Sequence, residues 1–92
     1  MWRIVWSKRV EKQLAKLPGY IVDKFRAWAQ AVEEEGMGEV RKVSGFHDEP
    51  LKGTRTGERS VRLSRSYRAI YVERKTGVIE VAEVTEVSKH EY

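Results

Sequence analysis

Arginines recur among the apolar residues of 59–74, RSVRLSRSYRAIYVER, and this pattern restricts the fold more than any other feature of the chain. In an extended strand, neighbouring side chains point to opposite faces, so Val61 and Leu63 share one face and Arg62 points to the other. The arginine face must stay solvated, because burying an unpaired guanidinium is costly. We therefore predict a sheet that is covered on one face only. The turn at 64–66 interrupts the alternation, so counting alone does not assign Arg68 to a face.

The N-terminal third predicts one strand and two helices. The β-branched and aromatic residues of 2–7 favour a strand, and Ser7 can then cap a helix over 8–17. Pro18 ends that helix and suits the first turn of a second one, at 19–35. The second helix carries an amphipathic stripe that can cover the apolar face of the sheet, formed by Ile21, Phe25, Trp28 and Val32.

The rest of the chain predicts an irregular connection followed by three strands. Residues 36–58 hold five glycines and a proline and can include a short strand at 39–43. A loop of this length is more often functional than not. The strands are expected at 59–63, 67–74 and 78–87. The order is βααβββ, an α+β fold in which two N-terminal helices pack on one face of a mainly antiparallel, twisted sheet.

The last of these strands carries two conflicting signals. Its valines recur every three residues, which suits a helix better than a strand. Its content of Val, Ile and Thr, however, is typical of strands. We expect the strand.

Length and composition limit the class of protein. Ninety-two residues are enough for one domain, 1–92, with a single small core. The chain has no cysteine, which excludes disulfides and thiolate metal sites and suits a reducing compartment. The N-terminal segment is too short and too charged for a signal peptide, and no apolar run approaches membrane-spanning length. We expect a cytoplasmic protein without a membrane partner.

The positive charge is concentrated in one part of the sequence. Residues 52–75 contain eight basic and two acidic residues, a net charge of +6, whereas the whole chain carries +4 and the remainder therefore −2. Most of these cations are arginines, whose planar fork binds phosphate bidentately and stacks on bases. This distribution is typical of a surface that binds nucleic acid. The alternative is an ordinary solvated surface.

The remaining residues suit the cleavage of RNA without a metal or cofactor. Two histidines, with no cluster of His, Cys and carboxylates close in sequence, argue against a metal site, and no Gly-rich phosphate loop is present. RNA cleavage needs a base for the 2′-hydroxyl, cations for the phosphorane and an acid for the 5′-oxygen. Glu49 or His90 can be the base and His90 the acid. His47 is expected to be an ordinary loop histidine. The candidate cations are Lys52, Arg62 and Arg68.

Three segments occur together, in this order, in one known family. They are EPLKG at 49–53, RSVRLSRSYRAIY at 59–71 and the C-terminal EVSKHEY at 86–92. With the two helices that precede them, they cover essentially the full chain, which resembles the RelE/YoeB/HigB toxins of bacterial type II toxin–antitoxin systems. That resemblance implies an mRNA interferase, an endoribonuclease that enters the ribosomal A site, where 16S rRNA holds the message, and cuts the mRNA to inhibit translation.

The resemblance also implies partners and residue roles. A cognate antitoxin would neutralise the toxin, which is expected to be monomeric when free and oligomeric through its antitoxin. Glu49 matches the general base of YoeB-like members, and Lys52 matches a phosphate clamp. His90 matches the proposed general acid and Tyr92 a tyrosine that contacts the substrate. Arg62 and Arg68 match the strand arginines that bind the scissile phosphate, and the RNA-binding surface would further include Arg55, Arg59 and Arg65.

Two other functions stay open at this point. ParE-type toxins share the fold and bind DNA gyrase without cleaving RNA, and a basic RNA-binding module need not cut at all. The C-terminal sequence His-Glu-Tyr separates His90 from Tyr92, whereas YoeB-like proteins have adjacent His and Tyr, so the division of acid and base roles between Glu49 and His90 is open. Glu49 could equally be a surface acid, and residues 90–92 a frayed end.

Overall fold

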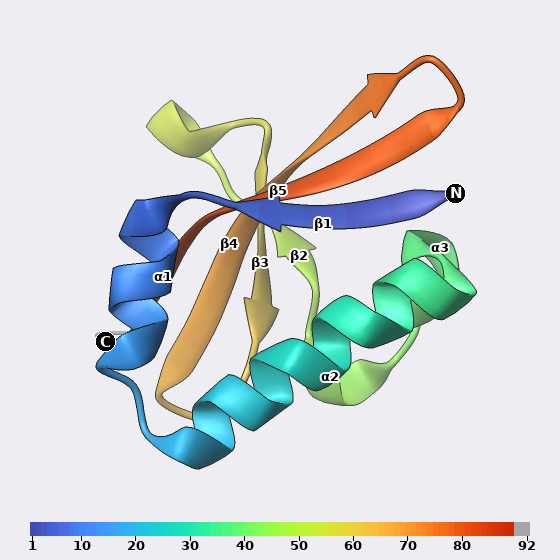
Figure 1. The fold of residues 1–92 in the computed structure, drawn as a ribbon. Helices are drawn as coiled ribbons and strands as arrows, with labels where there is room; N and C mark the ends of the chain where they lie inside the picture. Colours follow the sequence, from blue (N-terminus) through green and yellow to red (C-terminus); the bar gives the residue numbers. More distant parts are fainter. Residues whose placement is uncertain (90–92) are drawn as a thin grey trace.

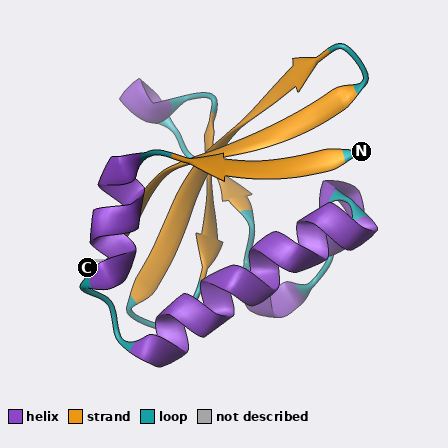
Figure 2. Cartoon of the chain, in the orientation of Figure 1, coloured by secondary structure: helices purple, strands orange, loops and turns teal. Residues whose placement is uncertain are grey.

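The structure, a computed structural model, describes residues 1–89 and confirms the expected α+β class. A five-stranded sheet carries three α-helices, with two short 3₁₀ turns between them and the later strands (Figures 1 and 2). The helices are α1 (Lys8–Ala15), α2 (Gly19–Glu35) and α3 (Met37–Val40). The strands are β1 (Trp2–Trp6), β2 (Glu49–Pro50), β3 (Glu58–Arg62), β4 (Tyr67–Thr76) and β5 (Ile79–Lys89). The 3₁₀ turns are η1 (Ser44–Phe46) and η2 (Gly53–Arg55).

The sheet is mainly antiparallel, as expected. Its strand order is β1-β5-β4-β3-β2, and only the β1–β5 pair is parallel. In Figure 1 the hairpin of β4 and β5 extends beyond the body of the sheet, at the upper right. This order places the N-terminal strand at one edge and the short strand β2 at the other.

One face of the sheet is covered by helices and holds the core. Trp28 of α2 is fully buried and packs on Tyr71 of β4, with ring centroids 5.4 Å apart. Val61 and Leu63 are buried on this face, as the alternation predicts. The expected stripe of α2 is fully buried. No helix within residues 1–89 has the length and apolar character to cross a membrane.

The helix boundaries follow local signals in the sequence. The hydroxyl of Ser7 accepts a hydrogen bond from the backbone N–H of Val10 at 3.5 Å, so the expected cap of α1 is present. Helix α1 stops two residues earlier than expected, because Leu17 precedes Pro18 and the residue before proline disfavours helical backbone. Gly36 ends α2 with a φ of 87°, a left-handed conformation that favours glycine.

The segment between α2 and β3 differs most from the prediction. The expected strand at 39–43 is wrong: α3 occupies its first half, because Met37 and Val40 lie one helical turn apart and are both buried in the core. Residues 49–50, expected as loop, form β2, which pairs with Ser60 and Arg59 of β3. The sheet therefore has a fifth strand at the edge next to the arginine-rich segment.

A β-bulge explains the three-residue spacing of valines in β5. Ile70 of β4 pairs with Glu86, but the next residue, Tyr71, pairs with Val84, which leaves Thr85 as an extra residue. The bulge resets the alternation, so Val84 and Val87 both face the core although they are three residues apart. The expected strand is confirmed, and its unusual period encodes the bulge.

Candidate active site

The strand register brings Arg62 and Arg68 together on the face that no α-helix covers, called the uncovered face below, although Ile70 on that face is fully buried. Arg62 at the end of β3 is the Cα partner of Arg68 near the start of β4, and directly paired side chains have Cβ atoms about 4.5–5.5 Å apart. Val61, the neighbour of Arg62, faces the core, so both arginines point away from the helices. Within residues 1–89 neither forms a salt bridge. Two like charges therefore lie side by side without an ion pair in this part of the chain, although Arg68 is close enough to Glu86 to help lower the pKa of its carboxyl.

A cavity of about 230 Å³ opens beside these two arginines. Its walls come from the η1–β2 loop, from β3 and from the β3–β4 turn. The lining residues are His47, Glu49, Ser60, Arg62, Ser64, Arg65, Tyr67 and Arg68. The lining has three cations, one carboxylate and one imidazole. The cations suit an anionic ligand, and the carboxylate and the imidazole can take a proton from it or give one to it.

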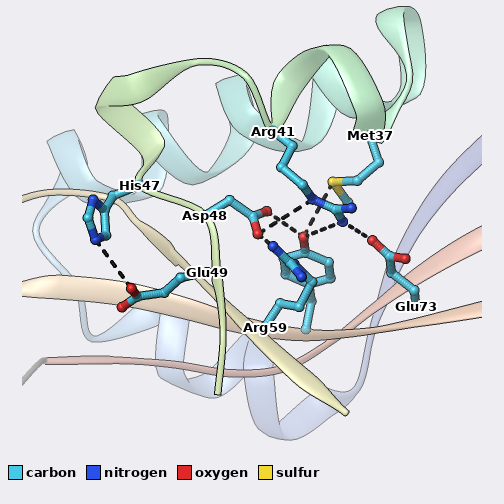
Figure 3. Close-up of polar contacts among 8 residues, drawn as sticks. Met37, Arg41, His47, Asp48, Glu49, Arg59 and Glu73 are labelled. Atoms are coloured by element: carbon cyan, nitrogen blue, oxygen red, sulfur yellow. Dashed lines mark hydrogen bonds and ion pairs between the residues drawn. The ribbon is translucent and has the colours of Figure 1, made fainter. Parts of the chain in front are cut away.

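Strand β2 positions Glu49 at this cavity. Glu49 is the Cα partner of Ser60, which in turn is the partner of Ile70, and cross-strand partners share a face. Ser60 lines the cavity, so the side chain of Glu49 lies on the uncovered face. The alternation sends the neighbouring Asp48 to the helix side, as Figure 3 shows: Asp48 is turned toward Arg41 and Arg59, away from Glu49.

Asp48 is the centre of a buried polar cluster that fixes this loop. Its side chain is only 1% exposed, and it accepts a hydrogen bond from Arg59 Nε at 2.7 Å and another from the hydroxyl of Tyr71. Arg41 Nε lies 3.6 Å from the same carboxylate, while its guanidinium also binds Glu73 (Figure 3). Burial and the hydrogen bond to Asp48 raise the pKa of Tyr71, so its hydroxyl stays a donor. Several donors thus hold one buried carboxylate.

His47 lies next to Glu49 at the cavity. Its Nε2 is 3.3 Å from Glu49 Oε2, and both side chains are about half exposed. His47 is the only residue other than glycine with a positive φ in the described chain, at 43°. Left-handed backbone costs a residue with a Cβ about 1–2 kcal/mol, so the surrounding contacts must hold it there.

The structure brings four of the expected site residues to one cavity and leaves others elsewhere. Glu49, Arg62, Arg65 and Arg68 line it. Lys52 is exposed in the loop after β2 and does not line it. His90 and Tyr92 lie outside the described residues, so their roles stay predictions.

Two of the expected RNA-binding arginines are ion-paired. Arg55 binds Glu58 at 3.1 Å and Glu86 at 3.4 Å, and Arg59 faces the helices and binds Asp48. The basic segment that the sequence predicts as one patch is therefore divided by strand alternation and by pairing with acids. Only part of its charge faces the cavity.

His47 also lines the cavity, which the sequence analysis did not predict. It lies in a loop and is about half exposed, as expected. The position of His47 two residues before Glu49, with the two side chains in contact, is the signal that could have pointed to it. Among residues 1–89, no three His, Asp or Glu side chains are close enough to hold a metal ion.

Comparisons with solved structures identify the fold. A YoeB/ParE toxin from Agrobacterium tumefaciens is 20% identical, with a TM-score of 0.74 over 97% of this chain and 99% of that one. YafQ from E. coli is 14% identical, with a TM-score of 0.74 over 98% of this chain and 94% of that one. The YoeB–YefM complex from Staphylococcus aureus contains a chain that is 17% identical, with a TM-score of 0.70 over 100% and 99%.

The chain thus has the fold of toxins from toxin–antitoxin systems. Within that class, its neighbours are YoeB, YafQ and the RelBE2 complex from Mycobacterium tuberculosis, so the expected RelE/YoeB-like fold is confirmed. No protein-family profile matches the sequence, and a search of curated proteins finds no match either.

Proposed function

We propose that this protein is the toxin of a type II toxin–antitoxin system and that it is an endoribonuclease. It cleaves mRNA in the ribosomal A site by attack of the 2′-hydroxyl on the adjacent phosphate, and so inhibits translation. The neighbouring folds support the toxin role, since they include a YoeB/ParE toxin and the toxin–antitoxin complexes YoeB–YefM and RelBE2. The cavity chemistry supports the cleavage.

One observation carries the enzymatic proposal: Arg62 and Arg68 are cross-strand partners on the uncovered face, beside a carboxylate and an imidazole. Two adjacent guanidiniums that form no ion pair within residues 1–89 repel each other and do not stabilise the fold. A scissile phosphate supplies the missing negative charge. Since charge grows on the phosphorane, the two arginines stabilise the transition state more than the ground state.

The reaction needs little else from the protein. A base from the His47–Glu49 pair removes the 2′-proton, the 2′-oxygen bonds to phosphorus, and the bond from phosphorus to the 5′-oxygen breaks. An acid protonates the leaving 5′-oxygen, the role that the resemblance assigns to His90. The products are a 2′,3′-cyclic phosphate and a 5′-hydroxyl. The arginines provide the positive charge that a metal ion would otherwise supply, so the proposal is a metal-independent cleavage.

The proposed partners follow from the same comparison. The solved YoeB–YefM and RelBE2 structures are complexes of a toxin with an antitoxin, and we infer that this chain also has a cognate antitoxin. The ribosome would present the message to the cavity, with Lys52 and other exposed cations contacting RNA near it. Tyr92 would stack on or hydrogen-bond the substrate.

Primer extension on message from cells that express the wild type or Arg68→Ala tests the proposal. The wild type should produce cuts in phase with the codons, and these should be lost in the variant while the protein still folds. Arg74→Ala is a matched control, because Arg74 pairs with Glu83 on the β4–β5 hairpin, away from the cavity. Growth arrest by both proteins without cut message would instead support the gyrase-binding alternative.

A further inference from the structure

His47 lines the cavity, and the resemblance gives it no role. It lines the cavity together with Arg62 and Arg68, and its Nε2 is 3.3 Å from the carboxylate of Glu49. Histidine is the side chain that most readily takes up and releases a proton near neutral pH. A histidine in contact with a carboxylate, next to cations that suit a phosphate, is the arrangement expected of a general base and the group that orients it.

The chain on both sides of His47 is anchored. Phe46, just before it, is 9% exposed and belongs to the core. The ammonium nitrogen of Lys24 lies over the Phe46 ring, 5.1 Å from its centroid. Asp48, just after it, is held by Arg59 and Tyr71 in the buried cluster. The two anchors hold His47 in its left-handed conformation, with its side chain at the cavity rather than in the core. A surface loop histidine without a role would need no such fixation.

We propose that His47 is the general base of the cleavage and that Glu49 is its positioning residue, an inference that rests on the proposed endoribonuclease function. In the substrate complex, Glu49 Oε2, which is 3.3 Å from His47 Nε2 in the structure, would accept the Nε2–H of the neutral imidazole and leave the lone pair on Nδ1 for the substrate. The 2′-hydroxyl gives its proton to Nδ1 as the bond from the 2′-oxygen to phosphorus forms. The imidazolium is then paired with the Glu49 carboxylate. The 5′-oxygen leaves with a proton from a separate acid, His90 in the resemblance.

This assignment differs from the one that the resemblance implies, in which Glu49 itself is the general base. A carboxylate is a weak proton acceptor at neutral pH, whereas an imidazole is close to the best match for that pH. A carboxylate in contact with an imidazole also fixes the tautomer and stabilises the imidazolium once it has formed. In the structure this contact is an ion pair without hydrogen-bond alignment, and catalytic contacts of this kind commonly become aligned when substrate binds.

Because the backbone of His47 is left-handed, its imidazole can be removed by a substitution that does not strain the fold. Glycine populates positive φ without strain, so His47→Gly should remove the imidazole and leave the fold at least as stable as in the wild type. Cleavage of ribosome-bound message by His47→Gly should fall by about 10²–10⁴-fold, the usual contribution of a general base. Added imidazole at constant pH should restore part of that rate, which a merely structural role of His47 would not allow.

Glu49→Ala is the matched comparison at the same cavity. It should lose less activity than His47→Gly, added formate should not restore it, and the double variant should be no slower than His47→Gly alone, because the two residues act as a unit. The inference is overturned if His47→Gly cuts like the wild type, if imidazole gives no rescue, or if formate rescues Glu49→Ala. In each of these cases the wild type still cleaves. A wild type that leaves ribosome-bound message intact would instead remove the proposed function itself.

Discussion

The two faces of the sheet use arginine in opposite ways within a single strand. Arg59 of β3 points to the helices, is 24% exposed and binds the buried carboxylate of Asp48. Arg62, three residues later, points to the uncovered face and forms no salt bridge within residues 1–89. A count of charges gives both residues the same weight. The strand register and the ion pairs show that one binds a buried carboxylate of the fold, while the other forms no ion pair within residues 1–89.

The same contrast separates two adjacent acids. Asp48 has a side chain that is almost fully buried and bound by arginine and tyrosine, whereas the side chain of Glu49 is 57% exposed and forms an ion pair only with His47 among residues 1–89. The alternation of β2 is the cause, because neighbouring side chains must lie on opposite sides of a strand. We therefore expect Asp48 to contribute to the stability of the fold and Glu49 to contribute to catalysis.

The contrast between Asp48 and Glu49 is tested most directly by replacing each acid in turn. Asp48→Ala leaves Arg41 and Arg59 without their shared buried carboxylate. Loss of one partner from a buried ion pair costs about 3–5 kcal/mol, so the free energy of unfolding should fall by that order. Urea unfolding followed by circular dichroism measures it. A loss below about 1 kcal/mol would show that the cluster is not the anchor of the loop.

Glu49→Ala is the control for that experiment. Its side chain is more than half exposed, and substitutions of this kind usually change the free energy of unfolding by no more than about 0.5 kcal/mol. The two variants differ by one position in the chain, so similar stabilities would contradict the division between the two sides of β2.

A second pair of variants compares the arginines. Arg62→Ala should lower the rate of message cleavage by about 10²–10³-fold, as the loss of one transition-state charge contact does elsewhere, and should leave stability nearly unchanged. Arg59→Ala should instead lower the free energy of unfolding by about 1.5–3 kcal/mol, since it removes a hydrogen bond to a buried carboxylate. Cleavage on ribosome-bound message and urea unfolding, measured on both proteins, check this. Equal stabilities would show that pairing with Asp48 contributes nothing.

The parts of the fold that could be predicted from sequence are those with a local signal. The stripe of α2, the cap at Ser7 and the alternation around Arg62 each follow from a few neighbouring residues, and the structure agrees with all three. The bulge at Thr85 also left a trace, in the spacing of valines. What it meant could not be known without the partner strand.

The parts of the site that could not be predicted from the sequence depend on contacts between residues far apart in the chain. Strand β2 has two residues and exists only because it pairs with β3, so no periodicity could reveal it. Arg59 was expected at the RNA because its partner, Asp48, lies 11 positions away on a loop whose direction was unknown. His47 was set aside for the same reason. Sequence reasoning found the cations of the cavity but not which of them were already neutralised.

Arg55 refines the comparison of the arginines. It shows that the face on which an arginine lies and its pairing with an acid are separate properties. It binds Glu86 of β5, which shares the uncovered face with Ile70 and Ser60. A hydrogen bond from Ser88 lowers the pKa of the Glu86 carboxyl most strongly, and the charges of Arg55 and Arg68 lower it further. Position on the uncovered face therefore does not by itself leave an arginine without an acid.

The smallest expected effect follows from that lowered pKa. Since the folded state favours the carboxylate of Glu86, its contribution to stability is present above the ordinary carboxyl pKa, about 4.3, and is lost as the pH falls through the lower folded value. Wild type and Glu86→Gln should differ by less than about 1 kcal/mol at neutral pH, and the difference should shrink below pH 4. Unfolding curves of both proteins between pH 7 and 3 measure it. A difference that grew in acid would mean that Glu86 is held protonated, and that the cation beside it, Arg68, has no anionic neighbour on that side of the cavity.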